Sequence, residues 1–185
     1  MVKIERSFPA PDSLESEAKK VSGSYEQPDV VSRLRKDFHD KCYICELKNL
    51  QDPQVEHLLP HKNGKYPERK FDWNNLFWSC GHCNGIKNQK KYDDGIIDCC
   101  KNDPELMMTF KLKDGKTEIS AKDEHNSMAV RTALLIYESF NLLNTGMRTY
   151  KSAMRYNELT KEMNLLYDNL AVSYTHLTLP TNSRV

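Results

Sequence analysis

The chain has 185 residues, of which 38% are hydrophobic and 29% charged, and its net charge is +1. These values fit one globular domain with a core of modest size, or a small core with an appended helical part. No stretch of the chain reaches the roughly 18 consecutive apolar residues of a membrane span, and the N-terminus "MVKIERSFPAPDSLESEAKK" lacks the apolar region of a signal peptide. We therefore expect a cytoplasmic protein without membrane contact.

Residues 1–27 are predicted to form an N-terminal arm that contains one short helix. "FPAP" argues against helix near the start, and Asp12 and Glu15 then have the spacing of a capping box. A stronger helix is predicted over 27–40, because its apolar residues recur on one face. That face consists of Val30, Val31, Leu34 and Phe38. Because this helix leads directly to Cys42, we expect it to pack against whatever the cysteines bind.

Four of the six cysteines form two C-x-x-C pairs, Cys42 with Cys45 and Cys80 with Cys83. This doubled pattern in a chain without a secretion signal indicates metal ligation rather than disulfides. Four thiolates are the ligands of a closed tetrahedral zinc site, which is structural because it leaves no position for water. The alternative is four cysteines packed as small apolar side chains. The 34 residues between the pairs exceed a minimal zinc ribbon, so a further element lies inside the loop that the metal would close.

The loop between the cysteine pairs predicts two strands followed by a helix. The first strand ends at Glu56-His57 in "VEHLLP", the second covers "NNLFWSC", and the helix opens near Asn84. Residues 61–91 carry seven Lys/Arg against two acidic residues, so this segment is +5 and the remainder of the chain is −4. A basic segment beside a metal site favours a polyanionic ligand, although a charge run is more often only a solvated face.

A β-hairpin and two helices are predicted after this segment. Polar and apolar residues alternate around Asp114-Gly115, the preferred dipeptide of a two-residue turn. The pattern then changes to helical spacing, with Ser127 and Thr145 as predicted N-caps of two helices that form an antiparallel pair.

The last 14 residues, "VSYTHLTLPTNSRV", continue neither a helical nor a strand period. They resemble the translation of a sequencing adapter, so we expect a scar in place of the native C-terminus and assign His176 no function. The predicted organisation is an N-terminal arm at 1–27, a core at 28–98, a hairpin plus helical region at 99–171, and the scar at 172–185.

The order of residues over about 40–91 resembles the HNH endonucleases, whose fold is a ββα-metal motif. Residue types, their order and both cysteine pairs agree with the branch of that family in which zinc pins the two ends of the hairpin. The resemblance implies an α+β protein with a zinc-stapled ββα-metal core. The predicted arm and helix precede this core, and the β-hairpin and helical pair follow it.

The resemblance also implies a role for each polar residue of the motif. His57 matches the general base that takes a proton from the attacking water, a task that needs a base titrating near neutrality. Asn75 matches the central Asn, which orients the histidine and its loop through hydrogen bonds. Glu56 and Asn84 match the ligands of one divalent ion, with Asn84 standing where many relatives have His. This HNN pattern favours Mg²⁺ or Mn²⁺ over zinc at the catalytic position, where the ion would polarise the phosphate and stabilise the leaving alkoxide.

Each residue also has a purely structural interpretation. An Asn after a C-x-x-C pair often caps a helix, an Asn in "NNL" serves a turn, and a lone His is more often structural than catalytic. Three lysines are predicted to position phosphate groups of nucleic acid: Lys62, Lys87 and Lys90. His61 would approach the phosphate from its loop, whereas His82 would make a backbone hydrogen bond or replace a zinc ligand. Packing roles are expected for Trp73 and Trp78, and no role is assigned to Cys99 and Cys100.

A longer stretch, about residues 3–168, resembles the HNH nuclease subunits of Septu-type anti-phage systems and of some retron defence systems. This resemblance implies an ABC-type ATPase partner, with the N-terminal arm and the C-terminal helices as docking surfaces. We therefore predict a metal-dependent endonuclease in bacterial antiviral defence, with DNA favoured as the substrate and RNA also open. One alternative is a non-catalytic zinc module that binds nucleic acid or a partner and does not need Glu56, His57 or Asn84. Another is a stand-alone endonuclease that needs no ATPase.

Overall fold

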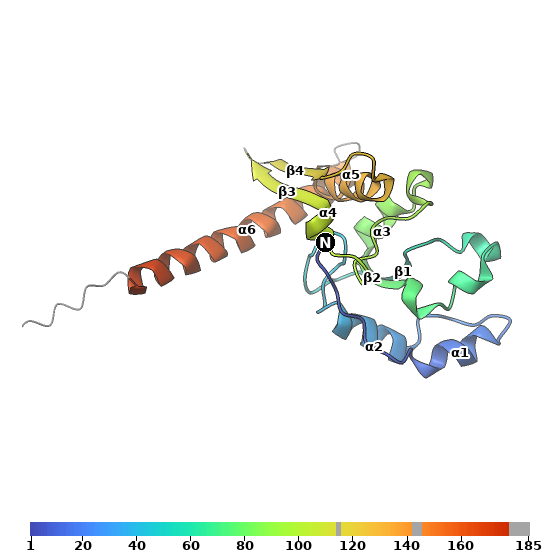
Figure 1. Cartoon of the computed structure of the whole chain (residues 1–185). Helices are drawn as coiled ribbons and strands as arrows, with labels where there is room; N and C mark the ends of the chain where they lie inside the picture. The colour runs from blue at the N-terminus through green and yellow to red at the C-terminus, as the bar shows by residue number, and fades with distance from the viewer. Residues whose placement is uncertain (114–115, 142–145, 178–185) are drawn as a thin grey trace, which may run out of the picture.

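The computed structural model describes residues 1–113, 116–141 and 146–177, which form a mixed α+β fold (Figure 1). The strands form two small antiparallel sheets, β1 (Pro53–His57) with β2 (Leu76–Cys80) and β3 (Met108–Lys113) with β4 (Lys116–Ala121). The α-helices are α1 (Asp12–Ala18), α2 (Pro28–Asp37), α3 (Gly81–Lys87), α4 (Pro104–Met107), α5 (Ser127–Asn141) and α6 (Gly146–Leu177). Short 3-10 helices occur at Lys62–Gly64, Pro67–Arg69, Trp73–Asn75 and Lys90–Tyr92. None of the described helices is long and apolar enough to cross a membrane.

The hairpin of β1 and β2, followed directly by α3, lies in the middle of the fold. Glu56 of β1 stands opposite Phe77 of β2, and α3 packs on both strands. Every residue of β2 is buried, whereas the first residues of β1 are exposed. Helix α3 begins at Gly81, three residues before the predicted opening at Asn84, because the extended backbone of Cys80 already supplies the N-cap position.

Helix α2 packs against this hairpin, and its predicted apolar face is confirmed. The fully buried residues of that face are Val30, Leu34 and Phe38, while Val31 is only partly buried. The ring of Phe38 meets the ring of Phe77 edge-on, with 5.5 Å between centroids. The helix ends before His39 and Asp40 because their φ angles of 54° and 58° lie in the left-handed region.

The N-terminal arm forms the predicted short helix α1 but not the predicted capping box. Its N-cap position belongs to Pro11, and Glu15 pairs with Lys19 one turn later instead of capping the helix. The residues before α1 run along the body of the protein. There the backbone N–H of Ile4 donates to the carbonyl of Cys99 at 2.9 Å, so the arm is anchored to the start of the C-terminal region.

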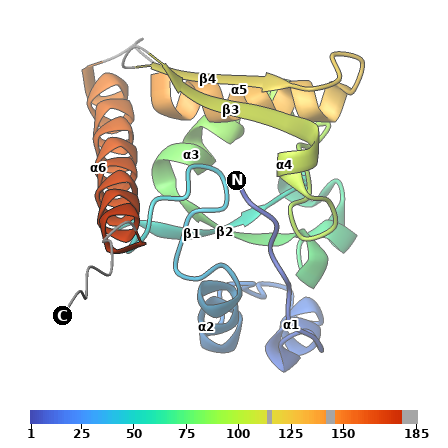
Figure 2. The same ribbon diagram turned by 60° about the vertical axis from the view of Figure 1, so that its left-hand side comes forward.

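The C-terminal region contains the predicted hairpin and helices, in a different arrangement from the one expected. Helix α5 begins at Ser127 and packs on β4 (Figure 2). Its N-cap is Asn126 and not the predicted Ser127, because the Oδ1 of Asn126 accepts from the N–H of Ala129 at 3.1 Å. The predicted turn at Asp114-Gly115 and the predicted N-cap Thr145 lie outside the described residues. Helix α6 does not run back along α5 as the predicted antiparallel pair required; in Figure 2 it stands at one end of α5 and runs across the direction of that helix. The physical reason is that the buried Arg155 of α6 donates to the sulfur of Cys80, which holds this part of the helix against the cysteine region.

Helix α6 also continues to Leu177, so residues 172–177 are helical although neither period was predicted there. No glycine or proline interrupts residues 147–177, so the helix can propagate through 172–177 from its earlier turns. The remaining tail, 178–185, lies outside the described residues, and the adapter origin of 172–185 stays a prediction.

Candidate functional site

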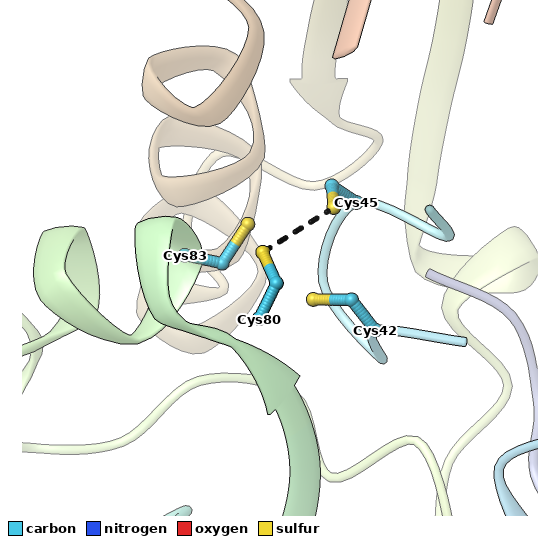
Figure 3. Close-up of side chains that lie close together, drawn as sticks. All are labelled: Cys42, Cys45, Cys80 and Cys83. Carbon is cyan, nitrogen blue, oxygen red and sulfur yellow. Dashed lines mark hydrogen bonds between the residues drawn. The ribbon is translucent and has the colours of Figure 1, made fainter. Parts of the chain in front are cut away.

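The four predicted metal ligands lie together in the structure. Cys42 and Cys45 belong to the loop after α2, Cys80 ends β2, and Cys83 lies in the first turn of α3. All four are buried free thiols whose sulfur atoms lie within 4.8 Å of one another (Figure 3). Tetrahedral coordination with Zn–S bonds of about 2.3 Å requires sulfur atoms about 3.8 Å apart, and those of Cys45 and Cys80 are 3.9 Å apart. This four-cysteine cluster can therefore hold a structural metal ion such as zinc.

A positive charge from α6 lies against the four-cysteine cluster. The guanidinium of Arg155 is buried and donates from Nη2 to the sulfur of Cys80 at 2.9 Å. Hydrogen bonds from the other three cysteines, Cys42 foremost, lower the pKa of Cys80, and the charge of Arg155 acts in the same direction. A thiolate is thus favoured at the sulfur nearest to the guanidinium, which suits a cluster that carries excess negative charge when it holds a divalent ion.

A pocket of about 260 Å³ opens on the side of the hairpin where β1 ends. Its lining includes six of the polar residues singled out by the sequence: Glu56, His57, His61, Lys62, Asn84 and Lys87. The exposed Lys90 does not line it. Asn75 is buried behind it, where it contacts the loop that follows β1. Strand β1, the segment that follows it and helix α3 thus bring together residues that lie up to 31 positions apart in the chain.

The imidazole of His57 is held in one tautomer. Its Nε2–H donates to the backbone carbonyl of Lys70 at 3.0 Å, which leaves Nδ1 as the proton-accepting nitrogen. Its ring packs edge-on against Tyr25 and His61, with centroid distances of 4.6 Å and 4.9 Å. Burial lowers the pKa of His57 to about 4, and the charges of nearby lysines act in the same direction. The ring is therefore neutral at pH 7, but its pKa lies below the near-neutral value expected of a general base.

Asn75 connects the two ends of the loop that follows β1. Its Oδ1 accepts from the N–H of Leu59 at 2.8 Å, and its Nδ2 donates to the carbonyls of Leu59 at 2.9 Å and Arg69 at 3.0 Å. The next carbonyl along the chain, that of Lys70, is the acceptor for His57. Asn75 therefore fixes the backbone that orients the imidazole, without touching the pocket itself.

The carboxylate of Glu56 is engaged at both oxygens. Its side chain is 4% exposed. The hydroxyl of Tyr43 donates to Oε2, and the ammonium of Lys87 lies 2.5 Å from Oε1 and donates to the carbonyl of His57 at 2.9 Å. Burial, together with the charge of Glu56, raises the pKa of Tyr43 well above its usual value, so the hydroxyl remains a donor at neutral pH. A buried carboxylate held in this way keeps a fixed position at the pocket wall.

The remaining polar residues are less closely tied to the pocket. Asn84 donates from Nδ2 to the side-chain oxygen of Gln54 at 2.5 Å, an interaction that uses the amide nitrogen and not the oxygen that would bind a cation. Lys62 pairs with Asp93 at 2.9 Å. The predicted lysines thus occupy three different environments, since Lys87 is buried against Glu56, Lys62 is paired at the surface and Lys90 is exposed.

Two residues of this region were missed by the sequence analysis. Tyr43 lies between the two cysteines of the first pair, and its only sequence signal was a bulky aromatic inside a tight C-x-x-C. Arg155 had no signal, because α6 reaches the cluster only through the tertiary fold. His82 donates to the carbonyl of Ser139 at 3.1 Å, which agrees with the backbone hydrogen bond predicted as one of its two options.

The other side chains with predicted packing roles are buried within the body of the protein. Trp73 and Trp78 are each 3% exposed, which confirms that they pack. The unassigned pair Cys99-Cys100 lies beside the arm, where the sulfur of Cys100 accepts from Arg6 at 3.5 Å. Neither tryptophan and neither of these cysteines lines the pocket.

Comparison of the chain with protein-family models and with curated proteins yields no match. Conclusions about function therefore depend on the residues and on their geometry.

Proposed function

We propose that this protein is a metal-dependent HNH-type endonuclease that hydrolyses phosphodiester bonds of nucleic acid. The observation that carries the proposal is the pocket in which a neutral histidine with a free Nδ1 lies beside a fixed carboxylate and an asparagine. The succession of β1, β2 and α3 has the order of a ββα-metal motif, with the four-cysteine cluster as its structural zinc site.

The proposed chemistry starts at His57. Its Nδ1 accepts the proton of a water molecule that attacks the scissile phosphorus, and the Lys70 carbonyl stabilises the resulting imidazolium through the Nε2–H. Asn75 has a positioning role, because it fixes the loop that carries this carbonyl. These residues supply the base and its orientation.

Glu56 and Asn84 are the proposed ligands of Mg²⁺ or Mn²⁺, since both offer oxygen donors at the pocket wall and hard cations prefer oxygen. When bound, the ion supplies Lewis-acid stabilisation of the phosphate and of the leaving oxygen. Lys62 is proposed to contact the phosphate backbone at the pocket rim and Lys90 outside it, contacts that carry no information about base sequence.

The role in antiviral defence and the ABC-type ATPase partner are proposed on the family resemblance alone. They predict that the isolated chain cleaves slowly and that an added ATPase subunit with ATP changes the rate. A cleavage rate that is fast and unaffected by such a subunit would favour the stand-alone endonuclease.

The test is cleavage of labelled plasmid, single-stranded DNA and RNA with Mg²⁺ or Mn²⁺. The intact chain is compared with His57→Ala and with His125→Ala, an exposed histidine remote from the pocket, at matched zinc content. We expect cleavage to be lost in the first variant and kept in the second. Nucleic-acid binding without cleavage, unchanged by substitution of His57, Glu56 or Asn84 in the presence of the ATPase partner, would support the non-catalytic zinc module.

A further inference from the structure

We propose that Lys87 is a displaceable counter-ion of Glu56, through which divalent-ion binding in the pocket becomes dependent on bound nucleic acid. The proposal rests on the proposed function and adds a regulatory property to the same site. It assigns to Lys87 two alternative anionic partners, the Glu56 carboxylate and a phosphate of the substrate.

The ion pair of Lys87 and Glu56 is unusually enclosed. The two side chains are 5% and 4% exposed, and their charged atoms are 2.5 Å apart. Elsewhere in the described part of the chain, the ion pairs of other lysines leave the lysine side chain at least 41% exposed. A buried pair keeps its strength at physiological salt, whereas exposed pairs are screened. Lys87 therefore holds Glu56 persistently and not as a passing surface contact.

This ion pair competes with a divalent ion for the same carboxylate. The Oε2 atom of Glu56 already accepts from the hydroxyl of Tyr43, so Oε1 is the oxygen that Lys87 shares with any incoming cation. The ammonium is 2.5 Å from Oε1, so a Mg²⁺ or Mn²⁺ ion about 2.1 Å from Oε1 would lie no more than about 4.6 Å from the ammonium. At that distance in a partly dehydrated site the two positive charges repel strongly. Strong binding of the ion therefore requires Lys87 to leave.

Lys87 can leave only towards another anion, because a buried ammonium without a partner is costly. Its side chain borders the pocket, and Asn84 lies three residues earlier on the same face of α3. A phosphate in the pocket offers the ammonium this second partner, and the departure of Lys87 frees Oε1. Binding of nucleic acid should therefore strengthen binding of the ion, and by thermodynamic linkage the ion should strengthen nucleic-acid binding by the same factor.

Tyr43 keeps the Glu56 carboxylate in place while Lys87 changes its anionic partner. The ring is 1% exposed and belongs to the loop after α2, so rotation of the Lys87 side chain on α3 does not displace it. When Lys87 turns away, Tyr43 still holds Oε2 and the carboxylate keeps its direction.

The experiment measures Mn²⁺ binding to the zinc-loaded full chain from the EPR signal of free Mn²⁺, with and without an oligonucleotide made non-cleavable by phosphorothioate linkages. Wild-type protein is compared with Lys87→Met, which keeps the length of the side chain and removes its charge, and with the control Lys161→Met, at an exposed lysine of α6 that does not line the pocket. Glu56→Gln with the same oligonucleotide measures the Mn²⁺ held by the oligonucleotide itself.

For wild type and for Lys161→Met we expect the oligonucleotide to tighten Mn²⁺ binding about tenfold, a typical coupling between two sites. Lys87→Met should bind Mn²⁺ more tightly than wild type without the oligonucleotide, and the coupling should fall to about twofold or less. Equal Mn²⁺ affinity of wild type with and without oligonucleotide would refute the proposal, and this measurement needs no variant to fold. Mn²⁺ binding that depends on Glu56 but not on Lys87 would refute the counter-ion role of Lys87 and leave the metal site intact. Mn²⁺ binding unaffected by Glu56→Gln would refute the metal site of the proposed function.

Discussion

Substitution of Tyr43 by Phe tests whether the buried hydroxyl orients the carboxylate of Glu56. The change removes one donor and keeps the ring, which packs against Phe77 with 4.9 Å between centroids. A hydrogen bond to a charged group contributes about 1.5–3 kcal/mol, and both partners are almost fully buried. We expect the free energy of unfolding to fall by about 2 kcal/mol, which for a chain of this size corresponds to a decrease in Tm of about 4–8 °C.

The same substitution should weaken Mn²⁺ binding about tenfold, equivalent to about 1.4 kcal/mol, because the carboxylate loses the donor that fixes its direction. Denaturant unfolding and EPR titration of Mn²⁺ measure the two effects on the same preparation. Tyr92→Phe is the matched control. Tyr92 borders the same pocket, but its buried hydroxyl donates to Glu138 at 2.9 Å, so this variant should lose stability without losing Mn²⁺ affinity. Unchanged stability and unchanged Mn²⁺ affinity in Tyr43→Phe would show that the hydroxyl does not orient Glu56.

Three further predictions concern the cluster, the loop and the histidine. If the four-cysteine cluster holds zinc, the metal would join the α2–β1 loop to β2 and α3, so chelation should unfold the hairpin region and lower Tm in calorimetry. Elemental analysis should find one zinc per chain, and a chain that keeps its Tm without metal would contradict this. Asn75→Ala leaves the N–H of Leu59 and two carbonyls without their partner; it should cost about 2 kcal/mol of stability and speed proteolysis of the loop after β1, whereas Asn74→Ala, at an exposed position, should not. The pKa of His57 is about 4 in the folded chain and about 6.5 when unfolded, so the unfolded chain binds the proton more readily and stability should fall as pH drops from 6.5 to 4. His57→Gln should lack that part of the pH dependence in denaturant titrations, and an unchanged profile would count against burial of the ring.

Local sequence patterns predicted the elements of the fold better than their arrangement. The face of α2 was predictable because its apolar residues recur at helical spacing, and three of them are buried in the structure. The hairpin of β3 and β4 was predictable because polar and apolar residues alternate along it. The direction of α6 was not predictable, since it depends on a contact between Arg155 and Cys80, which are 75 residues apart. No local period encodes such a contact.

For the candidate site too, the sequence predicted individual residues better than their surroundings. The doubled C-x-x-C spacing by itself indicates metal ligation, so the four-cysteine cluster was predictable from the sequence. Glu56 and His57 could be singled out as a pair, but their surroundings could not. The partners of Glu56 come from the cysteine loop and from α3, and the acceptor for His57 is a backbone carbonyl with no sequence signature. Lys87 was assigned to phosphate because its pairing with Glu56 depends on the packing of α3 on β1.

The course of α6 divides that helix into two parts with different tolerance of mutation. Substitution of Arg155 removes the hydrogen bond to the sulfur of Cys80, whereas residues 164–172 are exposed on every side of the helix. In the isolated chain, substitutions in this distal part should be almost neutral for folding, even at Leu166 and Leu170. Selection acting on the folding of the isolated chain would leave the distal part free to vary, so any constraint found there among relatives would have to come from outside this chain.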